Sequence, residues 1–171
     1  MLKKTVFSIL FLSFAAPITA MSSMPMADAA SLTVQLNNIN TQMNAIKRAW
    51  NIERAHIKTA KKSANLYAAI TPILEKIIAS EDFTTQMNTK VTAQFDSIVN
   101  QNATFASVKI DNNLSDFFPN LKMSDYGTKL YKAMANKAYF LLLGQKLAEK
   151  AKEIGETIRK TKLDNARESI A

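Results

Sequence analysis

The 171-residue sequence lacks cysteine and contains only one histidine, three glycines and four prolines. Without cysteine the chain can form neither a disulfide nor a thiolate metal site. Because His56 is the single imidazole, a zinc site with several histidines is excluded, and any catalytic triad would have to use this residue. The scarcity of glycine and proline among many Ala, Lys, Gln, Asn and Leu residues predicts long helices. We therefore expect a domain that is held together by helix packing.

Residues 1–20, MLKKTVFSILFLSFAAPITA, have the pattern of a cleaved secretory signal. A basic start is followed by an apolar centre at 5–16 and by a cleavage site at Ile18-Thr19-Ala20. Pro17 interrupts the apolar run before it reaches the roughly 20 residues of a membrane-spanning helix. Cleavage after Ala29 and an uncleaved N-terminal anchor are the alternatives. We expect an exported protein, found in the periplasm and at the cell surface.

The chain left after this cleavage would have 151 residues, enough for one domain with a hydrophobic core. Because 2 of the 22 basic residues lie in the signal, 20 would remain against 14 acids, a net charge of +6. Such a surface favours acidic partners, anionic lipid headgroups or the cell envelope. The basic residues are dispersed among acids rather than among aromatic residues, which disfavours a nucleic-acid interface. Solvated helix faces explain most of them.

The segment LTVQLNNINTQMNAIKRAW, residues 32–50, has apolar residues at alternating spacings of four and three. This spacing predicts a helix with one buried seam. The helix should begin at Asp28 or Ser31, either of which can act as N-cap, after a disordered segment at 21–30. The seam extends to Tyr67, so we expect an unbroken helix to that point. Its first residues are Leu32, Leu36, Ile39, Met43, Ile46 and Trp50.

Three start signals predict the remaining helices. Thr71-Pro72 indicates the start of a short helix. Ser80, followed by two acids, predicts a helix over 81–101. Ser124 predicts the start of the last helix, over 125–168. We expect the last helix to bury a stripe formed by Leu130, Met134, Ala138, Leu141, Gln145, Ala148, Ile154 and Ile158.

Residues 102–125 have the composition of a compact loop, with turn formers at 111–113 and Pro119 preventing a helix. Residues 104–110 fit a short strand or an irregular loop. Apolar side chains gather in this region and predict a partner-contact patch, with a small core at the bundle end as the alternative. The patch consists of Phe105, Phe117, Phe118, Leu121 and Tyr126.

These elements predict an all-α fold, an elongated and mostly antiparallel three-helix bundle with a small loop-rich appendage. The bundle would be a single domain over residues 31–168, with the appendage at about 102–125. The helices that follow the seam in the chain are its expected partners. A homo-oligomeric coiled coil is the alternative, which the blurring of the heptad pattern after Trp50 disfavours.

Four groups of residues contain side chains capable of chemistry, and each has a simpler interpretation. His56 has no second ligand at helical spacing, so we expect a structural or solvated role. Glycan cleavage by Glu75 and Glu81-Asp82 would require them to face each other across a sugar cleft, and the latter pair fits a helix start. Neighbouring side chains of 61–63 point in different directions, which excludes a Ser/Lys pair. The MSSMPM segment at 21–26 resembles copper motifs but lies in the expected tail. We predict no enzyme activity, catalytic residue, cofactor or metal.

Several features together resemble the minor pilin subunits of type IV secretion and conjugation systems, the TraC-like family. They are the signal, the Gln/Asn-rich segment at 32–50, the segment DFFPNLKMSDYGTKLYKAM at 116–134 and the long charged last helix. The resemblance implies a non-enzymatic three-helix bundle with a small globular appendage, placed at the pilus tip. It implies a role in pilus assembly or host-cell adhesion. The implied partners are other pilus or secretion-system subunits and a host or recipient cell-surface protein, with no small-molecule substrate.

A periplasmic holdase chaperone is the main alternative, because such proteins are also small, basic and helical. It would need an oligomerising β segment, which only residues 104–110 could supply. An envelope scaffold protein and a metal-binding envelope protein are further alternatives, the last resting on the MSSMPM segment alone.

Overall fold

The computed structural model describes residues 26–101 and 123–170. Within these ranges the chain forms four helices and no strand: α1 (Met26–Ala60), α2 (Ala64–Ile78), α3 (Glu81–Gln101) and α5 (Asp125–Glu168). The predicted all-α fold is confirmed. The expected signal at 1–20 and most of the expected appendage lie outside the described residues.

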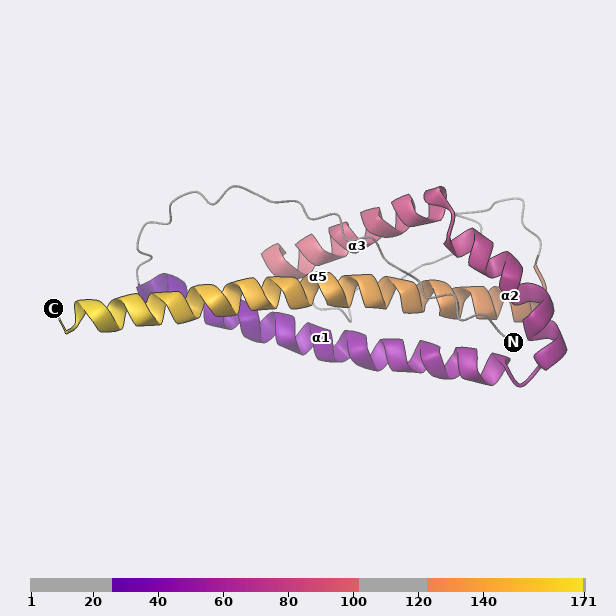
Figure 1. Ribbon diagram of the computed structural model, residues 1–171, viewed down its shortest axis with the longest axis horizontal. Coiled ribbons are helices and arrows are strands. Elements are labelled where there is room, and N and C mark those ends of the chain that lie inside the picture. Colours follow the sequence, from indigo (N-terminus) through magenta and orange to yellow (C-terminus); the bar gives the residue numbers. More distant parts are fainter. Residues whose placement is uncertain (1–25, 102–122, 171) are drawn as a thin grey trace, which may run out of the picture.

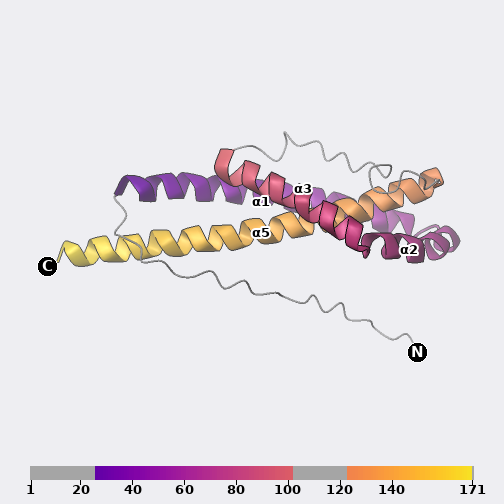
Figure 2. The same ribbon diagram turned by 90° about the horizontal axis from the view of Figure 1, so that it is seen from above.

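The helices α1 and α5 lie side by side and run in opposite directions along the long axis of the molecule (Figure 1). Helix α3 runs back against the direction of α1 and crosses over the α1–α5 pair, contacting both (Figure 2). The short helix α2 reverses the chain at one end of the bundle (Figure 1). The result is the predicted elongated three-helix bundle, with α2 as a fourth helix at its end.

One hydrophobic core runs through the bundle. The predicted seam of α1 forms its first side, since Ile39 and Ile46 are buried and Leu36, Met43 and Trp50 are half-buried against it. Apolar positions of α3 and α5 at helical spacing supply the facing sides, as expected for amphipathic helices that bury one stripe. The buried residues from these helices include Phe83, Met87, Val91, Ile98, Leu130, Leu143, Leu147 and Ile154.

The amide side chains of α1 bond the last turn of α3. Gln35 Nε2 donates to the carbonyl of Val99 at 2.9 Å, and Asn38 Nδ2 donates to the carbonyl of Ile98 at 3.4 Å. The buried Gln42 donates in turn to Asn38 Oδ1 at 3.2 Å. The last four carbonyls of a helix have no partner inside it. The Gln/Asn content of α1 therefore supplies donors that stabilise the C-terminal end of α3.

Two predicted N-caps are confirmed. Ser80 Oγ accepts a hydrogen bond from the backbone N–H of Phe83 at 3.3 Å, and Ser124 Oγ accepts one from Gly127 at 3.3 Å. Each hydroxyl satisfies a donor that the first turn of a helix leaves without a partner. The ends of α3 at Gln101 and of α5 at Glu168 also agree with the prediction.

The break after α1 was predicted wrongly. The first helix does not continue to Tyr67, because α1 ends at Ala60 and a turn at 61–63 redirects the chain into α2. Pro72 lies inside α2 rather than at its start. Proline in a helix interior leaves the carbonyl four residues earlier without its hydrogen bond. That residue, Ala68, is exposed, so solvent can reach this side of the helix.

Two further expectations need correction. Residues 26–30, expected to be disordered, form the start of α1, and three of these five residues are alanine, the strongest helix former. The buried stripe of α5 is also shifted: Leu141 is 45% exposed, whereas Phe140 and Leu143 are buried. The apolar run at 138–143 offers hydrophobic side chains on every face, so its periodicity does not select the buried one.

None of the helices in the described ranges combines the length and the apolar content that crossing a bilayer requires.

Replacing Gln35 by Glu should lower the free energy of unfolding by about 1–3 kcal/mol. The carboxylate cannot donate to Val99 and would face the negative end of the α3 dipole. Asn40→Asp is the matched control, since it adds the same charge at an exposed position of α1 and should cost less than about 0.5 kcal/mol. Urea denaturation of both variants measures the difference. Equal losses would contradict a specific role for the Gln35 amide.

The stability of the bundle should decrease as the pH rises from 10 to 12, because burial raises the pKa of Tyr139 from 10.0 to about 12. In this window the unfolded chain releases the phenol proton while the folded chain keeps it, so the proton balance favours unfolding. Tyr139→Phe, which keeps the edge contact with the Phe140 ring, should lose about 2 kcal/mol less over this window than the wild type. Urea denaturation at both ends of the window measures the two losses, and parallel losses would contradict the assignment.

Candidate functional site

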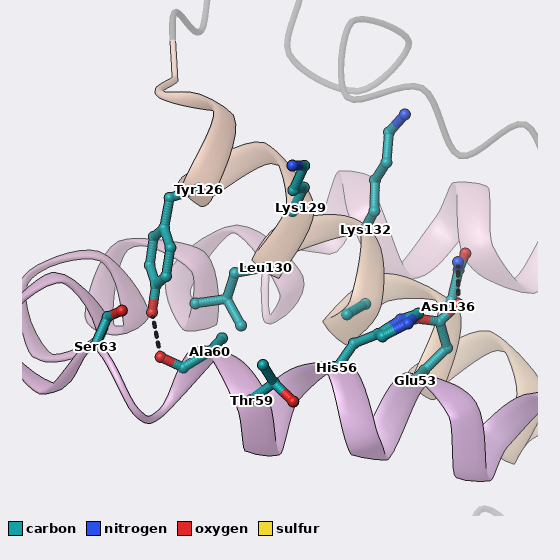
Figure 3. A pocket seen from close by; sticks show the side chains of 11 residues that line it. Glu53, His56, Thr59, Ala60, Ser63, Tyr126, Lys129, Leu130, Lys132 and Asn136 are labelled. Atoms are coloured by element: carbon teal, nitrogen blue, oxygen red, sulfur yellow. Dashed lines mark hydrogen bonds and ion pairs between the residues drawn. The ribbon is translucent and has the colours of Figure 1, made fainter.

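A pocket of about 620 Å3 lies between the C-terminal turns of α1 and the N-terminal turns of α5 (Figure 3). Spacings of three and four residues place the lining positions of each helix on one face. The volume falls within the range of roughly 300–1,000 Å3 that is typical of small-molecule sites. The lining residues are Glu53, His56, Thr59, Ala60, Ser63, Tyr126, Lys129, Leu130, Lys132, Ala133 and Asn136.

A hydrogen-bonded group from both helices forms one end of the pocket. Glu53 Oε2 lies 3.0 Å from His56 Nδ1, and Asn136 Nδ2 donates to Glu53 Oε1 at 2.9 Å. The Glu53 side chain is only 16% exposed, whereas the His56 side chain is 63% exposed. An ionised carboxylate accepts hydrogen bonds and donates none, so Nδ1 of His56 carries the hydrogen in this pair. Both oxygens of Glu53 therefore have a partner within the protein.

Lys129 and Lys132 bring positive charge to the α5 side of the pocket. Both are exposed residues in the first turns of α5, and Figure 3 shows their side chains extending away from α1. Within the described ranges neither ammonium group has a hydrogen bond or an ion pair. Glu53 is the one acid among the lining residues. The pocket thus carries more positive than negative charge.

Apolar side chains line the part of the pocket between the helices. Leu130 and Ala133 are buried, and Figure 3 shows Leu130 pointing from α5 toward Ala60. These groups give the pocket an apolar floor beneath a polar rim, which is the usual composition of a ligand site.

Tyr126 closes the other end of the pocket. Its hydroxyl donates to the carbonyl of Ala60 at 2.7 Å, and the same carbonyl accepts from the backbone N–H of Ser63 at 3.1 Å. Tyr126 is half-buried and connects the end of α1 to the start of α5. Its predicted role as a partner contact stays a prediction. The other four residues of the predicted patch, Phe105, Phe117, Phe118 and Leu121, lie outside the described residues.

Of the residues that the sequence singled out for chemistry, His56 and Ser63 line this pocket, whereas the acidic residues do not. Glu75, Glu81 and Asp82 are absent from the lining of this pocket, and its single carboxylate cannot supply the two that glycoside hydrolysis requires. The described ranges hold no group of three or more side chains suited to a metal ion. The spacing of Glu53 and His56 was visible in the sequence, but Asn136 lies 83 residues from Glu53 and gives no local signal.

No family model, curated protein or solved structure gives a match to this chain.

Removing the hydroxyl of Tyr126 by substitution with Phe should lower the free energy of unfolding by about 0.5–1.5 kcal/mol, because the Ala60 carbonyl loses a donor. Tyr67→Phe is the control: Tyr67 is also half-buried, and within the described ranges its hydroxyl makes no hydrogen bond. Thermal unfolding of the two variants gives the comparison. A loss in the Tyr67 variant as large as that in the Tyr126 variant would argue against the inter-helix bond as the cause.

Proposed function

We propose that the protein is an exported, non-enzymatic minor subunit of the pilus of a type IV secretion or conjugation system. It acts in pilus assembly and host-cell adhesion through contacts with other proteins. Its partners are other pilus or secretion-system subunits and a surface protein of the host or recipient cell.

The observation that carries this proposal is the elongated bundle of α1, α3 and α5 (Figure 1). The resemblance implied this architecture, and the caps and the core of this chain lead to the same architecture independently. An elongated bundle offers long helix faces to its neighbours, which suits a subunit that is built into a larger assembly.

An exposed apolar face on α2 supports a role in protein contacts. Leu66 and Ile73 are each 52% exposed, and their spacing of seven residues places them on one side of the helix. Ala69, between them, is also exposed. Contiguous apolar surface that remains in contact with water is typical of sites where another protein binds.

The C-terminal end of α5 supplies a second exposed helix face. Figures 1 and 2 both show α5 extending beyond the N-terminal end of α1. Ile154 is the last buried residue of α5, and Leu163 is 54% exposed. No other helix of the described ranges lies beside this end of α5, so it can pack against a neighbouring subunit.

The location of the protein tests the proposal. Cells are fractionated, surface pili are sheared off, and an antibody to the protein is applied to each fraction. We expect recovery with the sheared pili, because a tip subunit leaves the cell with its pilus. Recovery only in the soluble periplasm would contradict the pilus assignment and favour a chaperone instead.

Variants then locate the contact. Leu66→Asp with Ile73→Asp should strongly reduce recovery with pili, because two charges on the α2 face oppose burial in an interface. Thr85→Asp with Asn88→Asp is the matched control, adding the same charges at exposed positions of α3. Phe117→Ser with Phe118→Ser tests the predicted patch by attachment to host cells. Equal recovery of both double aspartate variants would remove α2 from the contact.

A further inference from the structure

We propose that the pocket between α1 and α5 binds a small organic anion, a carboxylate or phosphate group attached to an apolar chain. The inference goes beyond the proposed function and does not depend on it. The ligand is bound and not converted.

The charges around the pocket favour an anion. The one acid in the lining, Glu53, already accepts hydrogen bonds on both oxygens, from His56 and from Asn136. The ammonium groups of Lys129 and Lys132 have no such partner in the described ranges. Because the two lysines are three residues apart on α5, they lie on one face, where a single anionic group can contact both.

The floor of the pocket favours an apolar body on that anion. Ala60, Leu130 and Ala133 line it, and covering them with a hydrocarbon chain removes apolar surface from water. A bare inorganic ion would leave this surface uncovered. The pocket thus combines a cationic rim with an apolar floor, and an amphipathic anion matches both.

The two ends of the pocket are fixed by hydrogen bonds within the protein. Tyr126 is bonded to the end of α1, and Asn136 is bonded to Glu53. These positions are ten residues apart on α5, which corresponds to roughly 15 Å along the helix axis. Side chains that are already held in place lose little freedom on binding, so the cavity is preorganised for an extended ligand of this length.

The protein contains a natural reporter for this site. Trp50 is the only tryptophan, and it lies on α1 one turn before Glu53. Lys137 is the neighbour of Asn136, and its ammonium group lies 5.8 Å from the centre of the Trp50 ring. A ligand that contacts Asn136 or displaces these side chains should change the emission of Trp50.

The experiment titrates the full chain with sodium octanoate, octyl phosphate, octanol and octyltrimethylammonium while Trp50 fluorescence is followed. At least one of the two anions should bind saturably and about tenfold or more tightly than octanol and the cation. Added salt should weaken this binding, because the lysines are exposed. Binding of only one anion identifies the head group. Failure of both anions to saturate, or equal binding of octanol or the cation, would overturn the proposal.

Substitutions assign the binding to this pocket. Lys129→Gln with Lys132→Gln should weaken binding of the anion at least about tenfold. Lys160→Gln with Lys162→Gln is the matched control, because it removes the same charge from exposed positions near the far end of α5 and should leave binding unchanged. Circular dichroism establishes that both variants fold. Equal loss of affinity in the two variants, or unchanged affinity in the first, would refute the assignment.

Discussion

The long antiparallel contact between α1 and α5 positions every other part of the bundle. It buries the seam of α1, and the paired helices form the surface against which α3 packs. It also brings the end of α1 opposite the start of α5, and only this juxtaposition creates a pocket there. Neither helix alone could form the site, because its hydrogen-bonded group takes Glu53 from one helix and Asn136 from the other. The fold and the candidate site thus depend on the same interface.

Polar side chains fix the register of α1 against both α3 and α5. An apolar seam that repeats along a helix can slide by a whole repeat while still burying hydrophobic surface. Here the amides of Gln35 and Asn38 bond the end of α3, and near the other end of α1 the Tyr126 hydroxyl bonds the Ala60 carbonyl. A shifted register would leave these donors and acceptors without partners, at a cost for each one that is buried. Packing supplies the attraction, and the polar contacts select one alignment.

Local chemistry made much of the fold predictable. Ser80 and Ser124 act as the caps expected of them because an N-cap depends on a few adjacent residues. Features that depend on distant contacts were not predictable. The break at 61–63 accompanies the packing of α2 and the bond from Tyr126. Asn136 meets Glu53 only because α1 and α5 lie side by side in the folded bundle. In the sequence, the two lysines at the start of α5 have the pattern of ordinary surface charge. Only the folded structure shows that they line a pocket.

The part of α5 that extends beyond the core has a thermodynamic consequence. A short helical segment without tertiary contacts is only marginally stable in water. The last turns, beyond Ile158, contain no buried residue and rest on local contacts such as the ion pair between Asp164 and Arg167. Their amide hydrogens should exchange with solvent far faster than those beside Leu147. Any neighbour that packs there must supply the free energy of ordering these turns, so a contact at this end should be weaker than the same contact made on the preformed core of the bundle.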